Sequence, residues 1–289
     1  MQKIIKIFIL LVFTSIIPVT RAQKLPSELK ELRSTGIPKE TSGLCIVQST
    51  IYSINDSGNP SEIWFANLDS LYIGNAKWKA ININVKNVDW EAIETDAAHN
   101  HLYIGEFGNN KGKRKDLKII KIPIMGELNN SDSIVNIEFD YEDYSERVIE
   151  KSISIKGKKM HNFDCEAFWV LDSSIYLFTK NWGNRKCNIY KIPNQSGKHV
   201  AKKIGQFDPG FLVTDCVKVG DSLFYCGYSL TGNQYVGSVS WGTWENCNRK
   251  KLNIKPAQFE AITWDAEKGE FILSSESRKS QKESLFIRK

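Results

Sequence analysis

Residues 91–107 read EAIETDAAHNHLYIGEF: a short apolar strand, a tight turn, and a second strand that starts with an aromatic and aliphatic pair. The same pattern occurs four more times, as SGLCIVQSTIYSIND (42–56), EAFWVLDSSIYLFTK (166–180), DCVKVGDSLFYCGY (215–228) and EAITWDAEKGEFILSSE (260–276). Short runs of Ile, Val, Tyr and Phe between turn residues, with no long helical period, indicate an all-β protein.

Further strands follow these pairs at regular places. A third strand is predicted after each pair, at 62–68, 117–123, 188–193, 234–240 and 283–289. A fourth is predicted after the first four pairs, at 77–83, 133–141, 199–207 and 249–254. The last copy has no fourth strand, but residues 28–36 offer one from the other end of the chain. The pattern predicts a five-bladed β-propeller of four-stranded blades, closed by an N-terminal outer strand that completes the last blade and leaves no long sheet edge bare.

The N-terminal segment has the features of a secretory signal peptide. Lys3 and Lys6 precede an apolar run, and Thr20-Arg21-Ala22 ends in small residues, so cleavage is predicted after Ala22. We therefore expect residues 1–22 to be a signal peptide and the mature protein to be secreted or periplasmic, without a membrane anchor. A retained N-terminal anchor is the alternative.

The mature chain, 23–289, is expected to form a single β-propeller domain with an insertion at about 142–162. A hairpin or surface loop is the first interpretation of that insertion, and a sixth, degenerate blade is the other. Loss of residues 1–22 lowers the formal charge from +6 to +3, because it removes Lys3, Lys6, Arg21 and no acid. Such a charge gives little attraction for nucleic acid or membranes, and neither is expected as a partner.

The six cysteines do not form a C-x-x-C pair, which argues against a thiolate zinc site. Disulfides and small buried side chains remain equally open interpretations.

The first residues of the five copies are polar. In a propeller the inner strands surround one axis, so these residues would form a ring: Ser42, Glu91, Glu166, Asp215 and Glu260. Converging carboxylates raise one another's pKa unless a cation or protons compensate the charge. Oxygen ligands without His or Cys favour Ca²⁺, and the ring is therefore predicted to bind a calcium ion. The alternative is that the acids cap strand ends in solvent. Asp89 and Asp164, two residues upstream of Glu91 and Glu166, are interpreted as groups that cap a strand or that support the metal ligands, with capping the favoured role.

Residues after the second strands would lie around the channel mouth, where propellers commonly place ligand sites. The candidates with reactive side chains are Asp56, Glu106 and Lys180, together with His161 as a general base just before the third copy. The run KGKRK at 111–115 is interpreted as a solvated hairpin tip or a phosphate contact.

The first residues of the five copies are Ser, Glu, Glu, a small polar residue and Glu. This set resembles that of the calcium-activated nucleotidase (apyrase) family. That resemblance implies a five-bladed propeller with a central Ca²⁺ that hydrolyses nucleoside di- and triphosphates. It also implies that Ser42, Glu91, Glu166 and Glu260 are calcium ligands, whereas Asp215 stands where the family has a serine. The strings DWEAI, YIGEFGNN and EAF also resemble exported SdiA-regulated and phytase-like bacterial propellers.

The expected function is that of an exported calcium-binding propeller, monomeric, whose metal is mainly structural and whose channel face binds a small-molecule or protein ligand. A calcium-dependent hydrolase of phosphoric esters or nucleotide anhydrides is the alternative. A metal-free extracellular scaffold is the third hypothesis.

Overall fold

The computed structural model describes residues 24–26, 28–32, 36–124, 133–155, 158–254, 258–276 and 284–288, and for Lys158 and Arg288 the backbone alone. The predicted signal peptide, 1–22, lies outside these residues. Within the described part of the chain, no helix is long and apolar enough to cross a membrane.

The protein is all-β, as predicted, and its strands form successive four-stranded antiparallel meanders. In chain order, four of these meanders are β2 (Thr41–Val47), β3 (Thr50–Asn55), β4 (Glu62–Asn67) and β5 (Lys79–Asn82); β6 (Trp90–Thr95), β7 (His101–Glu106), β8 (Lys118–Pro123) and β9 (Val135–Tyr141); β12 (Cys165–Leu171), β13 (Ser174–Thr179), β14 (Cys187–Pro193) and β15 (Gly197–Phe207); β16 (Leu212–Val219), β17 (Ser222–Tyr228), β18 (Gln234–Ser240) and β19 (Asn248–Lys251). The last sheet joins β20 (Gln258–Asp265), β21 (Glu270–Glu276) and β22 (Ser284–Arg288) to β1 (Leu29–Leu32).

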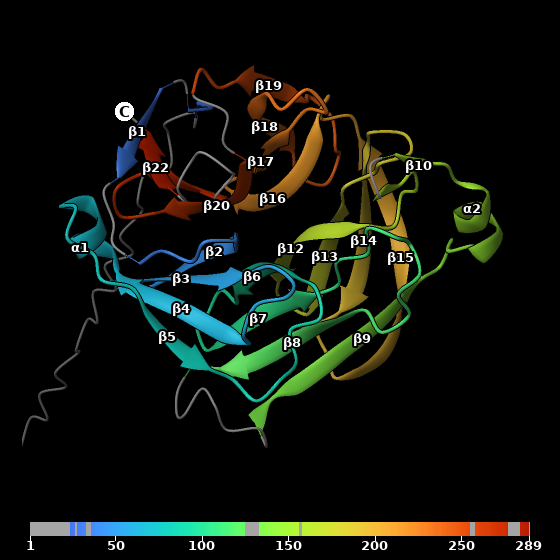
Figure 1. Cartoon of the computed structure of the whole chain (residues 1–289), viewed down its shortest axis with the longest axis horizontal. Coiled ribbons are helices and arrows are strands. Elements are labelled where there is room, and N and C mark those ends of the chain that lie inside the picture. The colour runs from blue at the N-terminus through green and yellow to red at the C-terminus, as the bar shows by residue number, and fades with distance from the viewer. Residues whose placement is uncertain are drawn as a thin grey trace, which may run out of the picture.

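The first strand of each meander lies at the centre of the molecule, and the later strands lie progressively further out (Figure 1). Strand β2 packs against β6 and β20, β12 packs against β6 and β16, and β16 packs against β20. These inner strands therefore surround one axis in a closed ring, which is the architecture of a β-propeller.

The sequence also accounts for the cores between neighbouring meanders. Alternate residues of each strand point to opposite faces, and both faces are apolar because each sheet has a neighbour on either side. Between the first two meanders, for example, Cys45, Ile54, Trp90 and Ile93 form one buried cluster.

The predicted closure is confirmed. Strand β1 pairs antiparallel with β22, from Leu29 opposite Arg288 to Leu32 opposite Leu285. The two ends of the chain thus complete one sheet, and Leu32 is buried in the cluster that joins the last sheet to the first meander.

Two features of the fold, one in the outer strands and one after β4, were not predicted. The first half of β15 pairs in parallel with β9, from Gly197 opposite Ile137 to Ala201 opposite Tyr141, while its second half pairs with β14. This contact joins two meanders into one eight-stranded sheet. A short helix, α1 (Leu68–Tyr72), follows β4 and is capped by the Asn67 side chain, which accepts a hydrogen bond from the Ser70 N–H.

The segment expected to be an insertion holds helix α2 (Glu146–Lys151) and a small hairpin of β10 (Ser154–Ile155) and β11 (Lys158–Lys159). It projects from the side of the ring (Figure 1) and contains no four-stranded meander among its described residues. The hairpin interpretation therefore agrees with the structure, whereas the helix was not anticipated.

Removal of β1 should destabilise the protein. A chain that begins at residue 36 leaves the outer edge of β22 unpaired and exposes the partners of Leu32, which is only 5% exposed. Loss of that burial alone costs about 2 kcal/mol. We expect the melting temperature to fall by about 5 °C, with more aggregation by light scattering, relative to a chain that begins at residue 24. Equal melting temperatures for the two chains would contradict this role of β1.

Candidate cation site at the centre of the ring

A β-bulge lies at the head of every inner strand. In each strand the ladder to the next strand skips one residue, and that residue is left unpaired; the skipped residues are Ser42, Glu91, Glu166, Thr214 and Glu260. A bulge redirects the side chain of its extra residue and often occurs beside a functional site. The five bulges therefore identify the residues that are structurally equivalent.

The ring differs from the predicted one in the fourth copy. Thr214 occupies the bulge position there, and Asp215 lies one residue beyond it. The buried Asp215 carboxylate accepts a hydrogen bond from the Ile262 N–H at 2.8 Å, so it joins two neighbouring inner strands. The sequence alignment matched acid to acid, but the bulge shifts the register by one residue.

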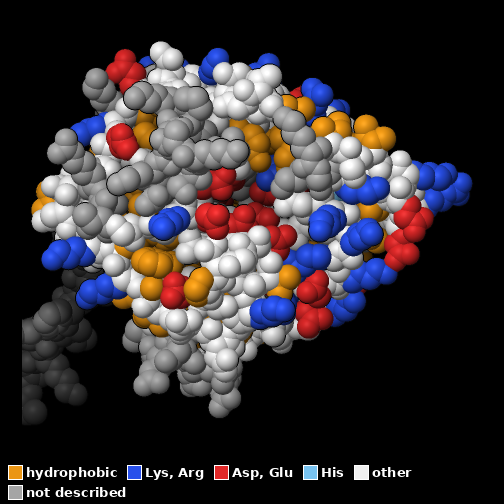
Figure 2. Space-filling model, viewed as in Figure 1, with side chains coloured by type: hydrophobic (Ala, Val, Ile, Leu, Met, Phe, Trp, Pro, Cys, Tyr) orange, Lys and Arg blue, Asp and Glu red, His pale blue; other side chains and the backbone are white. Residues whose placement is uncertain are grey.

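A small polar cavity of about 60 Å³ lies among these strand heads. It is lined by Glu40, Thr41, Ser42, Asp56, Glu91, Asn110, Glu166, Lys180, Tyr228, Gln258, Glu260 and Glu276. The cavity thus brings together four of the five predicted ring residues and excludes Asp215. Six carboxyl groups and one ammonium group face the cavity, and acidic side chains gather near the middle of the face shown in Figure 2.

Lys180 supplies the positive charge inside the cavity. Its Nζ lies 2.5 Å from Glu166 Oε1, and the two side chains are 5% and 3% exposed. The same ammonium lies 5.3 Å from the ring centre of Trp182 and 5.7 Å from that of Tyr228. Burial alone would lower the pKa of Lys180, but the nearby acidic groups, Glu166 foremost, hold it well above its ordinary value. Lys180 is therefore a buried cation that neutralises one of the acids around it.

Two of these acids, Asp56 and Glu91, lie close to Asp89, which does not itself line the cavity. Asp56, Asp89 and Glu91 each place a carboxylate oxygen within 4.8 Å of the other two. Glu91 is only 6% exposed, and among the described residues its carboxylate takes part in no hydrogen bond or ion pair. A buried carboxylate without a partner is costly, which indicates that this group binds a proton or a cation.

Gly108 forms the wall beside these carboxylates. A Cβ atom at this position would lie 2.2 Å from Glu91 Oε1 and 2.5 Å from Asp89 Oδ2. Only glycine leaves room for both carboxylates in their observed places. The set of oxygen donors, the unpaired Glu91 and the space left by Gly108 together fit a hard cation such as Ca²⁺.

The other candidate residues have structural roles. Glu106 is buried and accepts hydrogen bonds from the backbone N–H groups of Val88 at 2.8 Å and Asp89 at 3.0 Å. Its carboxylate thus supports the segment before β6, and Glu106 does not line the cavity. His161 accepts a hydrogen bond from the Phe163 N–H through Nδ1 at 3.0 Å. Burial lowers the pKa of His161, and the residue does not line the cavity.

The two acids upstream of the ring residues differ in role. Asp164 caps its neighbours as expected, because it accepts the Asn109 N–H at 2.6 Å and the Trp182 Nε1–H at 2.7 Å. Asp89, for which the same role was expected, instead places its carboxylate beside Asp56 and Glu91. The two acids hold the same position ahead of their strands, so the sequence alone does not separate their roles.

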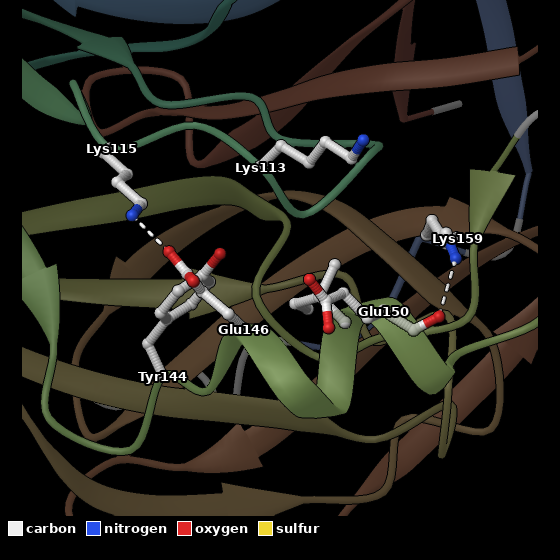
Figure 3. Close-up of a pocket in the computed structure, with 7 residues that line it drawn as sticks. Lys113, Lys115, Tyr144, Glu146, Glu150 and Lys159 are labelled. Carbon is white, nitrogen blue, oxygen red and sulfur yellow. Dashed lines mark hydrogen bonds and ion pairs between the residues drawn. The ribbon is translucent and has the colours of Figure 1, made fainter.

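In the run at 111–115, Lys111, Lys113 and Lys115 are exposed, as expected of a solvated tip, whereas Arg114 is half-buried. Arg114 turns inward, Lys115 pairs with Glu146 of α2, and the Tyr144 hydroxyl donates to the Gly112 carbonyl at 2.9 Å. A cavity of about 470 Å³ lies between this loop and α2, lined by Lys113, Lys115, Tyr144, Glu146, Ile149, Glu150 and Lys159 (Figure 3). The loop is therefore held from outside by the insertion.

All six cysteines are free thiols, and five of them are buried. The five buried cysteines are small side chains packed within the strands, which was one of the two interpretations of the sequence.

The acids of the site titrate far from their ordinary range. Burial first, then the nearby carboxylates of Glu166 and Asp56, raise the pKa of Glu91 well above its ordinary value. Burial raises the pKa of Glu260 to about 8 and that of Asp89 to about 6. The folded, cation-free protein therefore keeps protons on these groups that the unfolded chain has already released.

This shift predicts how stability depends on pH without a bound cation. A carboxyl group whose pKa is raised by folding contributes stability below its unfolded pKa and loses it as pH rises through the folded pKa. With chelator present, we expect the free energy of unfolding, measured by urea denaturation, to fall between pH 4.5 and 8. Glu260→Gln should reduce this fall. A free energy of unfolding that rises over the same range would contradict the pKa assignment.

No protein-family model matches this sequence, and no curated protein matches it. Solved structures with a similar fold include the WD40 β-propeller domain of Doa1, at 11% identity and a TM-score of 0.46 over 89% of this chain and 95% of that one. A chain of the mitotic checkpoint complex has 10% identity and a TM-score of 0.44 over 100% and 99% of the two chains. The exo-β-1,3-galactanase from Phanerochaete chrysosporium, solved with galactose, has 13% identity and a TM-score of 0.48 over 85% and 58%. Likenesses this distant do not indicate a family or an activity.

Proposed function

We propose that this protein is an exported, calcium-binding β-propeller in which each four-stranded meander is one of five blades. The ion would be held at the head of β6 by Glu91, Asp56 and Asp89. The observation that carries this proposal is the buried Glu91 carboxylate, which makes no hydrogen bond or ion pair among the described residues and lies beside two further carboxylates.

The proposed site is shifted from the one expected from sequence. A single ion bound by all the strand heads would have to share the cavity with the Lys180 ammonium, which lies beside Glu166. Like charges at such short range repel strongly in a buried environment. A cation bound by Glu91, Asp56 and Asp89 would not need Glu166, the acid that pairs with Lys180. Ser42 is also engaged, since its hydroxyl donates to the Glu91 carbonyl at 3.1 Å.

The chemistry of the donors favours calcium over other ions. All three side chains offer carboxylate oxygens, and no His or Cys lines the cavity. Calcium accepts carboxylates in irregular arrangements and fills its remaining positions with water, whereas Mg²⁺ requires near-octahedral geometry.

The size of the cavity favours a structural ion over a catalytic centre. Pockets that enclose organic ligands occupy about 300–1,000 Å³, whereas this one measures about 60 Å³. It has room for an ion and a few water molecules. The ion would stabilise the convergence of the inner strands, and a small-molecule or protein ligand would dock over the mouth of the channel.

The test is calcium titration of the mature protein, residues 23–289, by calorimetry. We expect binding of one Ca²⁺, with weaker binding of Mg²⁺. At a hundred times the dissociation constant, ligand binding adds about 2.7 kcal/mol to the free energy of unfolding, so the melting temperature should rise clearly. Glu91→Gln should abolish both effects. Glu94→Gln is the matched control, because Glu94 is buried on the same strand but does not line the cavity.

The other functions give different results in the same preparation. Hydrolysis of nucleotides or a phosphomonoester that is lost with chelator and in Glu91→Gln would favour the hydrolase. A melting temperature that is unchanged by chelator, with no bound ion, would favour the metal-free scaffold and overturn the proposal. Export is tested separately, because the secreted protein should begin at Gln23.

A further inference from the structure

We propose that Arg114 is the positioning residue of the cation site, although it touches none of the proposed ligands. The inference rests on the proposed function, because it concerns how the Asp89 ligand and the Gly108 wall are held in place. It also assigns a role to the basic run at 111–115, which contributes no side chain to the cavity lining.

The Arg114 guanidinium binds the side chain of Glu106 and the backbone carbonyl of Gly108. Its Nη2 lies 2.7 Å from Glu106 Oε1, and its Nη1 donates to the Gly108 carbonyl at 3.0 Å. Its Nε donates to Asp116 at 3.0 Å. The side chain is only 16% exposed, so these bonds are largely shielded from water. All three nitrogen atoms of the guanidinium are therefore used.

The two groups that Arg114 holds both reach Asp89. Glu106 accepts the backbone N–H of Val88 and that of Asp89, at 2.8 and 3.0 Å. On the other side, the Gly108 N–H donates to the Asp89 carbonyl at 3.1 Å. Asp89 is thus fixed through both its N–H and its carbonyl, and each of these bonds leads back to Arg114 through one intermediate residue.

This arrangement requires a planar fork and not just a positive charge. A lysine at position 114 could reach Glu106 or the Gly108 carbonyl, but a single ammonium does not reproduce the bonds of a guanidinium in fixed directions. Groups that orient a metal ligand through its backbone or side chain commonly change metal affinity 10–100-fold when they are removed.

The two possible roles of Arg114, as a nearby charge or as a positioning residue, predict opposite changes in calcium affinity when the residue is replaced. If Arg114 acted only as a nearby positive charge, its removal would reduce the repulsion of Ca²⁺ and tighten binding. If it positions Asp89 and Gly108, its removal weakens binding. The sign of the change in affinity therefore separates the two roles.

The experiment compares calcium titrations of three variants of the mature protein with wild type. We expect Arg114→Gln and Arg114→Lys each to bind Ca²⁺ about 10–100-fold more weakly. Lys113→Gln is the matched control, because it removes one positive charge from the same loop and leaves these bonds intact; its affinity should be unchanged or slightly higher. Amide hydrogen exchange in the presence of chelator gives a readout without cation. Exchange at Val88 and Asp89 should be faster in both Arg114 variants than in Lys113→Gln.

The possible failures are distinguishable. Wild-type protein that binds no Ca²⁺ overturns the proposed function and this inference with it. Wild-type binding together with equal or tighter binding by Arg114→Gln overturns only the role of Arg114. Should Arg114→Gln fail to fold, the Arg114→Lys variant keeps the charge and decides the matter through its affinity and its exchange rates. An Arg114→Lys variant with wild-type affinity would show that the charge suffices and would also overturn the inference.

Discussion

Replacement of Lys180 by methionine is expected to lower the free energy of unfolding by about 3–5 kcal/mol at pH 8 with chelator present. Methionine fills a similar volume but leaves Glu166 in a buried cavity without the ammonium that lies 2.5 Å away. Removal of one partner from a buried ion pair is far more damaging than removal of both, because the remaining charge is uncompensated. Urea denaturation of the cation-free protein measures the loss directly.

The double variant Lys180→Met/Glu166→Gln is the control, and it should recover most of the stability lost in the single variant. The loss should also shrink at pH 5, because the unpaired Glu166 can take up a proton there and become neutral. In the opposite direction, calcium should bind the single variant more tightly than wild type, since one positive charge has left the cavity. A loss below 1 kcal/mol, or a double variant no more stable than the single one, would show that Lys180 and Glu166 do not depend on each other.

Replacement of Gly108 by alanine is expected to weaken calcium binding at least a hundredfold. The added Cβ would lie 2.2 Å from Glu91 Oε1 and 2.5 Å from Asp89 Oδ2, so at least one of the two carboxylates must move. An ion that loses a carboxylate ligand, or holds it in the wrong place, loses a large part of its binding free energy. Removal of a group that only orients a ligand already costs about 10–100-fold in affinity. Calorimetric titration with Ca²⁺ measures the effect.

Gly183→Ala is the matched control for this experiment. A Cβ at Gly183 would lie 2.8 Å from Asn162 Oδ1, so this position is also crowded, though less than position 108, and neither Gly183 nor Asn162 lines the cavity. We expect this variant to keep wild-type affinity for calcium. If Gly108→Ala also keeps it, the ion does not lie between Glu91 and Asp89, and the proposed ligand set is wrong.

The arrangement of strands was predictable because it depends on local patterns that repeat. Each copy has two apolar strands joined by a turn, and the turns hold one residue at positive φ where the chain reverses; these are Gln48, His99, Asp172, Gly220 and Gly269. A sheet that cannot bury both faces alone requires neighbours on either side, so repeated meanders imply a ring. The missing fourth strand of the last copy likewise predicted its pairing with β1, because an uncovered edge is unfavourable.

The errors arose where local patterns leave the register open. The sequence alignment matched one acid with another and so placed Asp215 in the ring. A β-bulge inserts one residue in this strand, and Thr214 therefore occupies the ring position. Because side chains alternate across a strand, this single step turns Asp215 toward the next inner strand, where it accepts the Ile262 N–H. The parallel contact between β9 and β15 was also not predicted, since its two strands lie far apart in the chain and carry no matching signal.

The sequence by itself determined the all-β class, the succession of meanders, the closure by the N-terminal strand and the gathering of acids at the inner strand heads. These features depend on the alternation of hydrophobic residues and on the requirement that every strand of a sheet be paired. Both can be recognised in short stretches of the sequence. Only the tertiary structure decided which acids lie close enough to share a cation. It placed Lys180 beside Glu166, brought Asp56 from one meander to Asp89 and Glu91 of the next, and set Gly108 against them. The physical reason is that interactions between charges depend on separations of a few ångströms, and packing between meanders sets those separations.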